Sequence, residues 1–120
     1  MPSETLTATI RRNGSVAVID LIGEINALSE EALNEAYASA MATENGAVEG
    51  VLLNFADVTY INSTGIALIV GLLAKARQTH TPLMTCGLSD HYREIFEITR
   101  LSDFMSIASD EAAALAGFAG

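Results

Sequence analysis

Apolar residues along the chain are grouped into short segments, and the first of these predict a β-hairpin. Residues 5–11 alternate loosely between polar and apolar, and Asn13-Gly14 follows them. Both of these residues tolerate positive φ, so the pair favours a two-residue hairpin turn. Residues 16–22 are apolar at most positions, as expected of a strand that is largely buried, and this strand is expected to end at residues 23–26.

The rest of the chain alternates between strand-like and helix-like segments. The expected strands are short and mostly apolar, and they span residues 51–55, 83–88 and 104–108. The expected helices carry apolar residues at helical spacing, and they span residues 29–45, 64–78, 89–98 and 110–118. Ser29 is the expected cap of the first of these helices, which Asn45-Gly46 is expected to stop. The alternation predicts a single α/β domain over residues 1–120, with a mixed, mainly parallel sheet of about five strands and about four helices.

The helix expected at residues 64–78 is apolar on two faces. One face is expected to pack on the sheet, and it carries Ile66, Ile69, Val70 and Leu73. Leu68 and Leu72 fall on the opposite face, where an ordinary surface helix would carry charge from its first turn. Two interpretations remain open: a neighbouring helix covers Leu68 and Leu72, or the two residues form an exposed docking patch.

The charge of the chain restricts the partners that it can bind. Its 120 residues include 15 acidic and 6 basic side chains, which gives a formal net charge of −9. Nucleic acids and anionic membranes both attract clusters of Lys and Arg, so neither is an expected partner. A protein partner or a neutral ligand agrees better with this charge.

Cysteine use and the N-terminal sequence favour the cytoplasm. The lone cysteine, Cys86, cannot form an internal disulfide, which suggests a reducing compartment. The first residues lack the basic and apolar regions of a signal peptide. The longest uncharged apolar run, residues 65–74, is well short of the roughly 20 residues that span a bilayer. We therefore expect a soluble, cytoplasmic protein.

The start of the helix at residues 64–78 offers the most distinctive candidate chemistry. It reads Asn62-Ser63-Thr64-Gly65 and carries no formal charge. In a structural interpretation, Asn62 or Ser63 caps the helix and Gly65 allows a close approach to the sheet. In a functional interpretation, a kinase phosphorylates an exposed hydroxyl there. The phosphate would add about −1.5 to −2 charges beside free helix amides, which the helix tolerates and a docked partner does not.

Three segments together resemble a known family. They are, in chain order, G-E-I-N at residues 23–26, L-N-F-A-D-V-T-Y-I-N-S-T-G-I at residues 53–66 and E-I-F-E-I-T-R-L at residues 94–101. In this order and spacing they resemble the STAS domain of bacterial anti-sigma factor antagonists. The resemblance covers nearly the whole chain, and the turn motif is its most specific part.

The resemblance implies regulation of transcription by partner switching. An unphosphorylated antagonist of this family binds an anti-sigma factor, which is a serine kinase with a GHKL-type ATPase fold, and so releases the sigma factor. The kinase phosphorylates the antagonist, and a serine phosphatase restores binding. By its position in the motif, Ser63 is the expected phospho-acceptor. The expected partner-binding residues are Glu24, Asn26, Asn62, Thr64, Gly65, Ile66, Leu68 and Leu72.

The chain departs from the family pattern at two positions. Asn62 stands where the family usually has Asp before the acceptor, and Asn26 stands where an Asp commonly ends the G-E-x-D motif. Both residues keep a side-chain carbonyl for capping, and both remove a charge. Since each follows the C-terminal end of a strand, we expect both at the same end of the sheet. The partner would then meet a less acidic surface.

An enzyme is the first alternative from another functional class. A nucleophilic Ser63 would need a base, and the two histidines, His80 and His91, lie in polar segments outside any G-x-S-x-G motif. Cys86 is expected to be a buried strand thiol. No residue pattern indicates a metal or cofactor site. We therefore expect no enzyme activity and no cofactor.

A non-switching interaction subunit is the second alternative. STAS domains also belong to stressosome-like assemblies and to lipid-transport ATPase assemblies. Permanent docking in such an assembly would use the face of Leu68 and Leu72. Self-association into a homodimer through the same face is a further possibility.

Overall fold

Five strands and four α-helices form the chain, as a computed structural model that describes residues 6–42 and 46–119. The strands are β1 (Thr7–Asn13), β2 (Val16–Ile25), β3 (Gly50–Ile61), β4 (Leu83–Cys86) and β5 (Ser106–Ala108). The α-helices are α1 (Glu30–Ala40), α2 (Ser63–Gln78), α3 (Asp90–Ile98) and α4 (Glu111–Ala119). Two short 3-10 turns, η1 (Ala27–Ser29) and η3 (Leu101–Asp103), precede α1 and follow α3.

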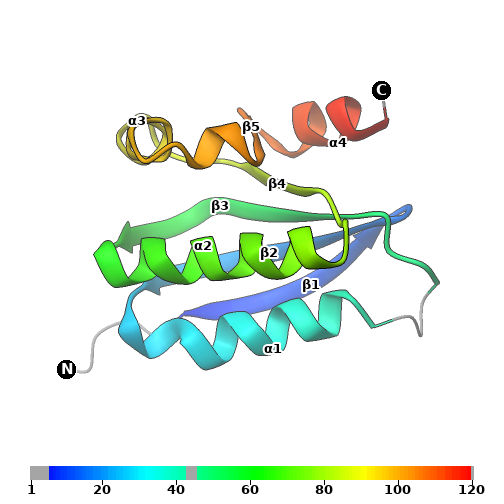
Figure 1. Cartoon of the computed structure of the whole chain (residues 1–120), viewed down its shortest axis with the longest axis horizontal. Coiled ribbons are helices and arrows are strands. Elements are labelled where there is room, and N and C mark those ends of the chain that lie inside the picture. The colour runs from blue at the N-terminus through cyan, green and yellow to red at the C-terminus, as the bar shows by residue number, and fades with distance from the viewer. Residues whose placement is uncertain (1–5, 43–45, 120) are drawn as a thin grey trace.

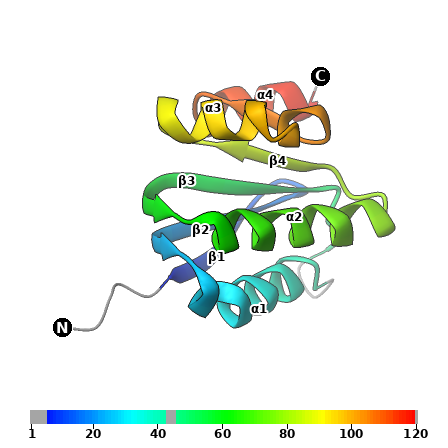
Figure 2. The same ribbon diagram turned by 60° about the vertical axis from the view of Figure 1, so that its left-hand side comes forward.

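The five strands form one mixed sheet in the order β1-β2-β3-β4-β5. The hairpin pair β1 and β2 is antiparallel, and every later neighbour is parallel. Helices α1, α2 and α3 lie over one face of the sheet, and α4 lies over the other (Figures 1 and 2). The sequence prediction of an α/β fold with an N-terminal hairpin and a mainly parallel sheet is therefore confirmed.

Alternate residues of the strands supply two separate cores. The larger core lies between the sheet and the three helices on its first face, and Phe55 of β3 meets Phe96 of α3 there edge to face, with 5.9 Å between ring centroids. The smaller core lies under α4, where Leu52 and Met84 pack on Ala114. Burying one such large apolar side chain is worth about 1.5–3 kcal/mol. The first residues of β3 and all of β4 are covered on both faces, so residues 50–53 and 83–86 are buried without a gap.

An ion pair joins the hairpin to the C-terminal helix. The Arg11 guanidinium Nη2 donates to Asp20 at 2.9 Å and to Glu111, the first residue of α4, at 2.6 Å. Asn54 of β3 also donates to Asp20, at 2.9 Å. The hydrogen bonds from Arg11 hold the pKa values of both carboxyl groups below their usual range. This cluster ties the first residue of α4 to the N-terminal hairpin.

Strand β3 is much longer than the predicted segment at residues 51–55. Its pairing with β2 shifts register twice, between Asp20 and Ile22 and again between Gly23 and Glu24. Each shift places an extra residue on the β3 side, as a β-bulge does, and breaks the alternation of buried and exposed positions. The sequence pattern therefore missed the second half of the strand, which runs directly into the Asn62 turn.

Several predicted boundaries differ from the structure. Strand β4 ends at Cys86 rather than at residue 88, and β5 begins at Ser106 rather than at residue 104, because Phe104 closes the 3-10 turn η3. Asn13 pairs with Val16, so the hairpin loop is Gly14-Ser15 rather than Asn13-Gly14, and only Gly14 takes a positive φ, +63°. Helix α1 ends at Ala40, before the predicted stop. Asn45 of that predicted stop lies outside the described residues.

The buried face of α2 is rotated from the predicted one. Leu72 is only 1% exposed and belongs to the larger core, whereas Val70 is 44% exposed. The reason is that α1 packs beside α2, with Lys75 of α2 donating to Asn34 of α1 at 2.8 Å. The helix buries the side that faces both α1 and the sheet. The interpretation with a covering helix is correct for Leu72, and the exposed Leu68–Leu72 docking or dimer patch is wrong.

The first turn of α2 approaches the backbone of β2 closely. A Cβ atom at Gly65 would overlap the carbonyl oxygen of Ile25 and lie 2.8 Å from its carbonyl carbon. Backbone atoms cannot move aside as the tip of a flexible side chain can. Gly71, two turns further along the same helix, has open space at the same position.

Alanine at these two glycines should have opposite effects on stability. We expect Gly65→Ala to lower the free energy of unfolding by about 1–3 kcal/mol, because the new methyl group forces α2 away from β2. We expect Gly71→Ala to raise it by about 0.5–1 kcal/mol, because alanine favours the helix. Urea denaturation of the two variants and the wild type measures both. Equal stability of the two variants would contradict the close approach.

Candidate functional site

The ends of β2 and β3 lie side by side and open two turns at one edge of the sheet. Ile25 pairs with Ile61 as the last ladder position, and the Asn62 amide donates to the Ile25 carbonyl at 3.2 Å. Asn26 follows Ile25 directly, so the two asparagines leave the sheet as neighbours. The prediction that Asn26 and Asn62 lie at the same end of the sheet is confirmed. The C-terminal edge of parallel strands is where open α/β sheets commonly place their binding sites.

Asn62 is the cap of α2. Its backbone is extended, with φ −92° and ψ −179°, and its Oδ1 accepts from the Gly65 amide at 2.8 Å. Ser63 is therefore the first helical residue, and its side chain is not needed for capping. The Ser63 and Thr64 side chains are both exposed, and their hydroxyls form no hydrogen bond with the described residues.

The neighbouring turn is held by a reciprocal capping box at η1. Asn26 Oδ1 accepts from the Leu28 amide at 2.9 Å, and the Asn26 amide donates to Ser29 Oγ at 3.0 Å. The buried Ser29 hydroxyl also donates to the Glu24 carbonyl at 3.2 Å. Ser29 precedes α1 as predicted, but its side chain does not cap that helix, because it is committed to the turn.

Tyr92 of α3 forms a hydrogen bond with the end of β3, on the side of β3 that does not face β2. Strand β4 pairs with β3 only as far as Asn54, so the last residues of β3 have β2 on one side and no strand on the side of β4. The Ile61 amide donates instead to the Tyr92 hydroxyl at 2.9 Å. Tyr92 falls within the helix expected at residues 89–98, and no local signal in the sequence could have indicated this contact across 31 residues.

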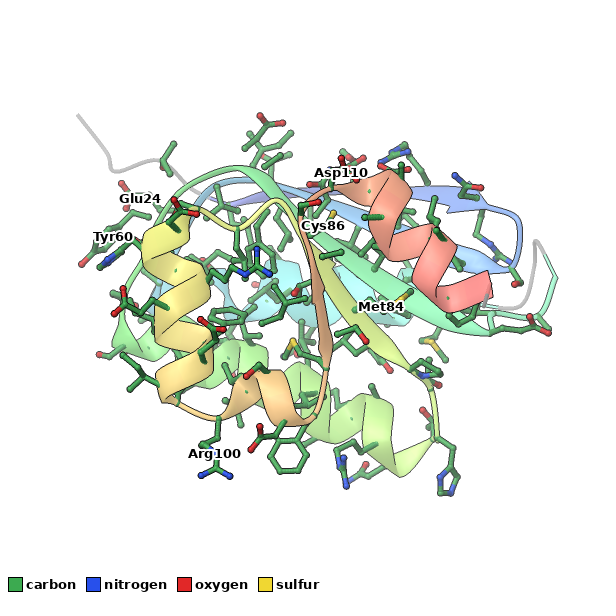
Figure 3. The ribbon with its side chains drawn as sticks, turned by 90° about the horizontal axis from the view of Figure 1, so that it is seen from above. Glu24, Tyr60, Met84, Cys86, Arg100 and Asp110 are labelled. Atoms are coloured by element: carbon green, nitrogen blue, oxygen red, sulfur yellow. The ribbon has the colours of Figure 1, made fainter. Side chains whose placement is uncertain are left out.

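The charge around the two turns is negative. Glu24 pairs with Tyr60 across β2 and β3, and Figure 3 shows the two side chains together at one end of α3. Of the six basic residues, five are engaged in contacts elsewhere: Arg11, Arg12, Lys75, Arg77 and Arg100. The sixth, Arg93, is exposed on α3 and forms no ion pair with the described residues. An anion at the turn would meet the first amides of α2.

The predicted partner-binding residues divide by exposure. Ser63 and Thr64 are exposed, and partial exposure is found for Glu24, Asn26, Asn62, Ile66 and Leu68. Gly65 is buried and acts through its close approach to β2. Leu72 is buried under α1 and cannot offer its side chain to a partner. The predicted residues that a partner can still reach therefore lie on or beside the two turns that begin at Asn26 and Asn62.

Neither histidine forms a hydrogen bond with Ser63 in the described part of the chain. His80 is exposed beyond the far end of α2, a helix of 16 residues that measures about 24 Å at 1.5 Å per residue. His91 is exposed and packs edge to face on Tyr92. Burial raises the pKa of the Cys86 thiol to about 11, so this cysteine is a poor nucleophile. Over the described ranges, no three His, Cys, Asp or Glu side chains gather as metal ligands would.

No helix in the described part of the chain combines the length and the apolar character needed to cross a bilayer.

Comparison with known sequences gives matches over most of the chain. The family model described as STAS domain matches residues 7–114. A protein of Listeria monocytogenes named anti-sigma-B factor antagonist is 35% identical over 95 residues, which are 78% of this chain and 79% of the relative. A protein of Staphylococcus aureus with the same name is 39% identical over 57 residues, which are 48% of this chain and 53% of the relative.

Solved structures share the fold at lower sequence identity. An anti-sigma factor antagonist from Mycobacterium paratuberculosis superposes with a TM-score of 0.83, at 17% identity over 99% of this chain and 100% of the other. SpoIIAA in its unphosphorylated form gives 0.69 at 17% identity, over 94% and 97%. The phosphorylated form of Bacillus SpoIIAA gives 0.65 at 22% identity, over 89% and 96%.

Substitutions at the turn should separate the cap from the free hydroxyl. We expect Asn62→Ala to lower the free energy of unfolding by about 1 kcal/mol, because the Gly65 amide loses its acceptor. We expect Asn62→Asp to keep the cap and to gain about 0.3–1 kcal/mol from the helix dipole. Ser63→Ala should stay within about 0.5 kcal/mol of the wild type. Chemical denaturation measures all three, and a larger loss for Ser63→Ala than for Asn62→Ala would refute the assignment of the cap.

Proposed function

The chain belongs to the STAS domain family of anti-sigma factor antagonists, and from this premise we propose that it switches partners through phosphorylation of Ser63. In its unphosphorylated form it binds an anti-sigma factor of the GHKL-type serine kinase class in the cytoplasm. The bound anti-sigma factor releases its sigma factor, and transcription from the corresponding promoters begins. A phosphate on Ser63 ends the complex, and a serine phosphatase restores it.

The observation that carries the proposal is the exposed, unbonded hydroxyl of Ser63. A kinase can reach this side chain because it is exposed at the first position of α2. Phosphorylation transfers the γ-phosphoryl group of ATP to Ser63 Oγ, with loss of the hydroxyl proton and release of ADP. Asn62 caps the helix independently, so the modification breaks no hydrogen bond of the fold.

The electrostatic surroundings of Ser63 determine whether a phosphate there affects the fold or the binding of a partner. A phosphoserine carries about −1.5 to −2 charges at neutral pH. At the helix start the dipole favours an anion by about 0.3–1 kcal/mol, and the first amides of the helix have no partner within it. A neutral Asn62 adds no repulsion. The phosphate is therefore compatible with the folded domain, and its cost falls on a partner that must exclude water from the turn.

Relatives support this mode of control. SpoIIAA, which shares the fold, has been solved in an unphosphorylated and a phosphorylated form. In this chain both turns keep their geometry with asparagine, since Asn26 and Asn62 each use only the side-chain carbonyl as an acceptor in the caps. Loss of the two aspartates therefore leaves the acceptor presented in the same way. The replacement of aspartate by Asn26 and Asn62 instead makes the surface that the partner contacts less acidic.

Phosphotransfer should depend on Ser63 alone. With a purified GHKL-type anti-sigma factor from the same organism and radiolabelled ATP, we expect the wild type and Thr64→Ala to be labelled. We expect no label on Ser63→Ala. In a calorimetric titration, Ser63→Asp should raise the Kd for the nucleotide-bound anti-sigma factor at least about 10-fold, or about 1.4 kcal/mol. Equal labelling of the wild type and Ser63→Ala would remove Ser63 from this role.

A further inference from the structure

Two large apolar side chains near the Ser63 turn are exposed and do not pack in either hydrophobic core. Leu28 is 75% exposed and Tyr60 is 51% exposed. Neither belongs to the two cores or to the partly buried residues that pack on them. Single exposed apolar residues are ordinary on protein surfaces, so their position and surroundings must decide whether they matter.

Both residues are fixed at the edge that carries Ser63. Leu28 follows Asn26 by two positions, and its amide is bound by the Asn26 side chain in η1, which contacts the start of α2. Tyr60 precedes Asn62 by two positions and pairs with Glu24, and Figure 3 shows these two side chains together at one end of α3. The two turns are joined by the hydrogen bond from the Asn62 amide to β2. Leu28 and Tyr60 therefore come from the two turns on which Ser63 is presented.

The charges around them indicate the kind of surface that can cover them. Four acidic residues lie close to Leu28 or Tyr60 in the sequence or in the strand pairing: Glu24, Glu30, Glu31 and Asp57. None of them forms an ion pair with the described residues. A second copy of this chain would place acids against acids, and a nucleic acid or anionic membrane would be repelled in the same way. A protein with apolar pockets inside a rim of Lys and Arg is complementary to this edge.

We propose that Leu28 and Tyr60 are the apolar anchors of the partner surface, and that they insert into two pockets of a protein with a basic rim. This inference rests on the proposed function and names what the partner must recognise. Anchors of this kind give most of the binding energy of an interface, and the charged rim mainly speeds association. Ser63 follows Tyr60 by three positions and opens α2, which contacts η1.

This arrangement explains how one phosphate can release a partner whose rim is basic. A phosphate on Ser63 then lies inside the contact, where water is excluded, and among the described residues no ion pair brings a basic side chain to the two turns. The partner must then move away from the turn, and Leu28 and Tyr60 leave their pockets together. The attraction of the rim charges, which is screened by salt, is too weak to compensate for the loss of both anchors.

The chain offers matched controls for each anchor. Ile98 is 71% exposed and Phe104 is 53% exposed, close to the values for Leu28 and Tyr60. Both controls lie near Arg100, which Figure 3 shows at the end of α3 opposite to Glu24 and Tyr60. All four side chains are exposed, so truncation to alanine should leave the domain folded, which circular dichroism and thermal melting verify.

The test is a calorimetric and kinetic titration of the purified anti-sigma factor against the four alanine variants. We expect Leu28→Ala and Tyr60→Ala each to raise the Kd at least about 10-fold, as interface anchors do. We expect Ile98→Ala and Phe104→Ala to stay within about twofold. Raising the salt from about 0.05 to 0.5 M should lower the association rate constant of the wild type by at least about 10-fold.

The outcomes distinguish this inference from the proposed function. Equal Kd values for the four variants would overturn the assignment of Leu28 and Tyr60 as anchors. The proposed switch would still be supported if the wild type binds the anti-sigma factor and Ser63→Asp does not. An association rate that does not change with salt overturns the basic rim. No binding by the wild type contradicts the proposed function, and the anchors fail with it.

Discussion

The site depends on the parallel pairing of β2 with β3. This pairing continues for one more hydrogen bond after its last residue pair, Ile25 and Ile61. The hydrogen bond from the Asn62 amide to the Ile25 carbonyl brings two turns together that are 36 residues apart in the chain. Gly65 makes this possible, because any larger residue would push α2 away from β2. The position of the Ser63 hydroxyl is therefore set by backbone geometry and is independent of its own chemistry.

Adjacent residues of the turn differ in what they contribute to the fold. Asn62 provides the cap, Gly65 provides the close packing, and Ser63 between them is left without a structural bond. A residue with no bond to lose can be modified at little cost to the fold. An effect of modification must then arise at a partner, where the new charge meets a surface that excludes water. This division agrees with a switch that changes binding and leaves the domain folded.

The alternation of apolar and polar residues was sufficient to predict the sheet and the helices, whereas the candidate site came from the motif at residues 53–66 and its resemblance to the family. It failed at residues 56–61, because two bulges interrupt the strand period there. It also misplaced Leu72, because the wheel of a single helix cannot show that α1 packs against its side. The exposure of Leu28 and Tyr60 and the support from Tyr92 depend on contacts between distant segments, so local patterns carry no signal for them.

The central claim is that phosphate at Ser63 blocks docking without changing the fold. Amide NMR spectra of the fully phosphorylated protein, recorded with and without the anti-sigma factor, measure both parts at once. The account predicts a dispersed spectrum whose shifts are confined to residues near the two turns, and no further change when the anti-sigma factor is added. Loss of dispersion, or the same partner-induced changes as in the unphosphorylated protein, would contradict it.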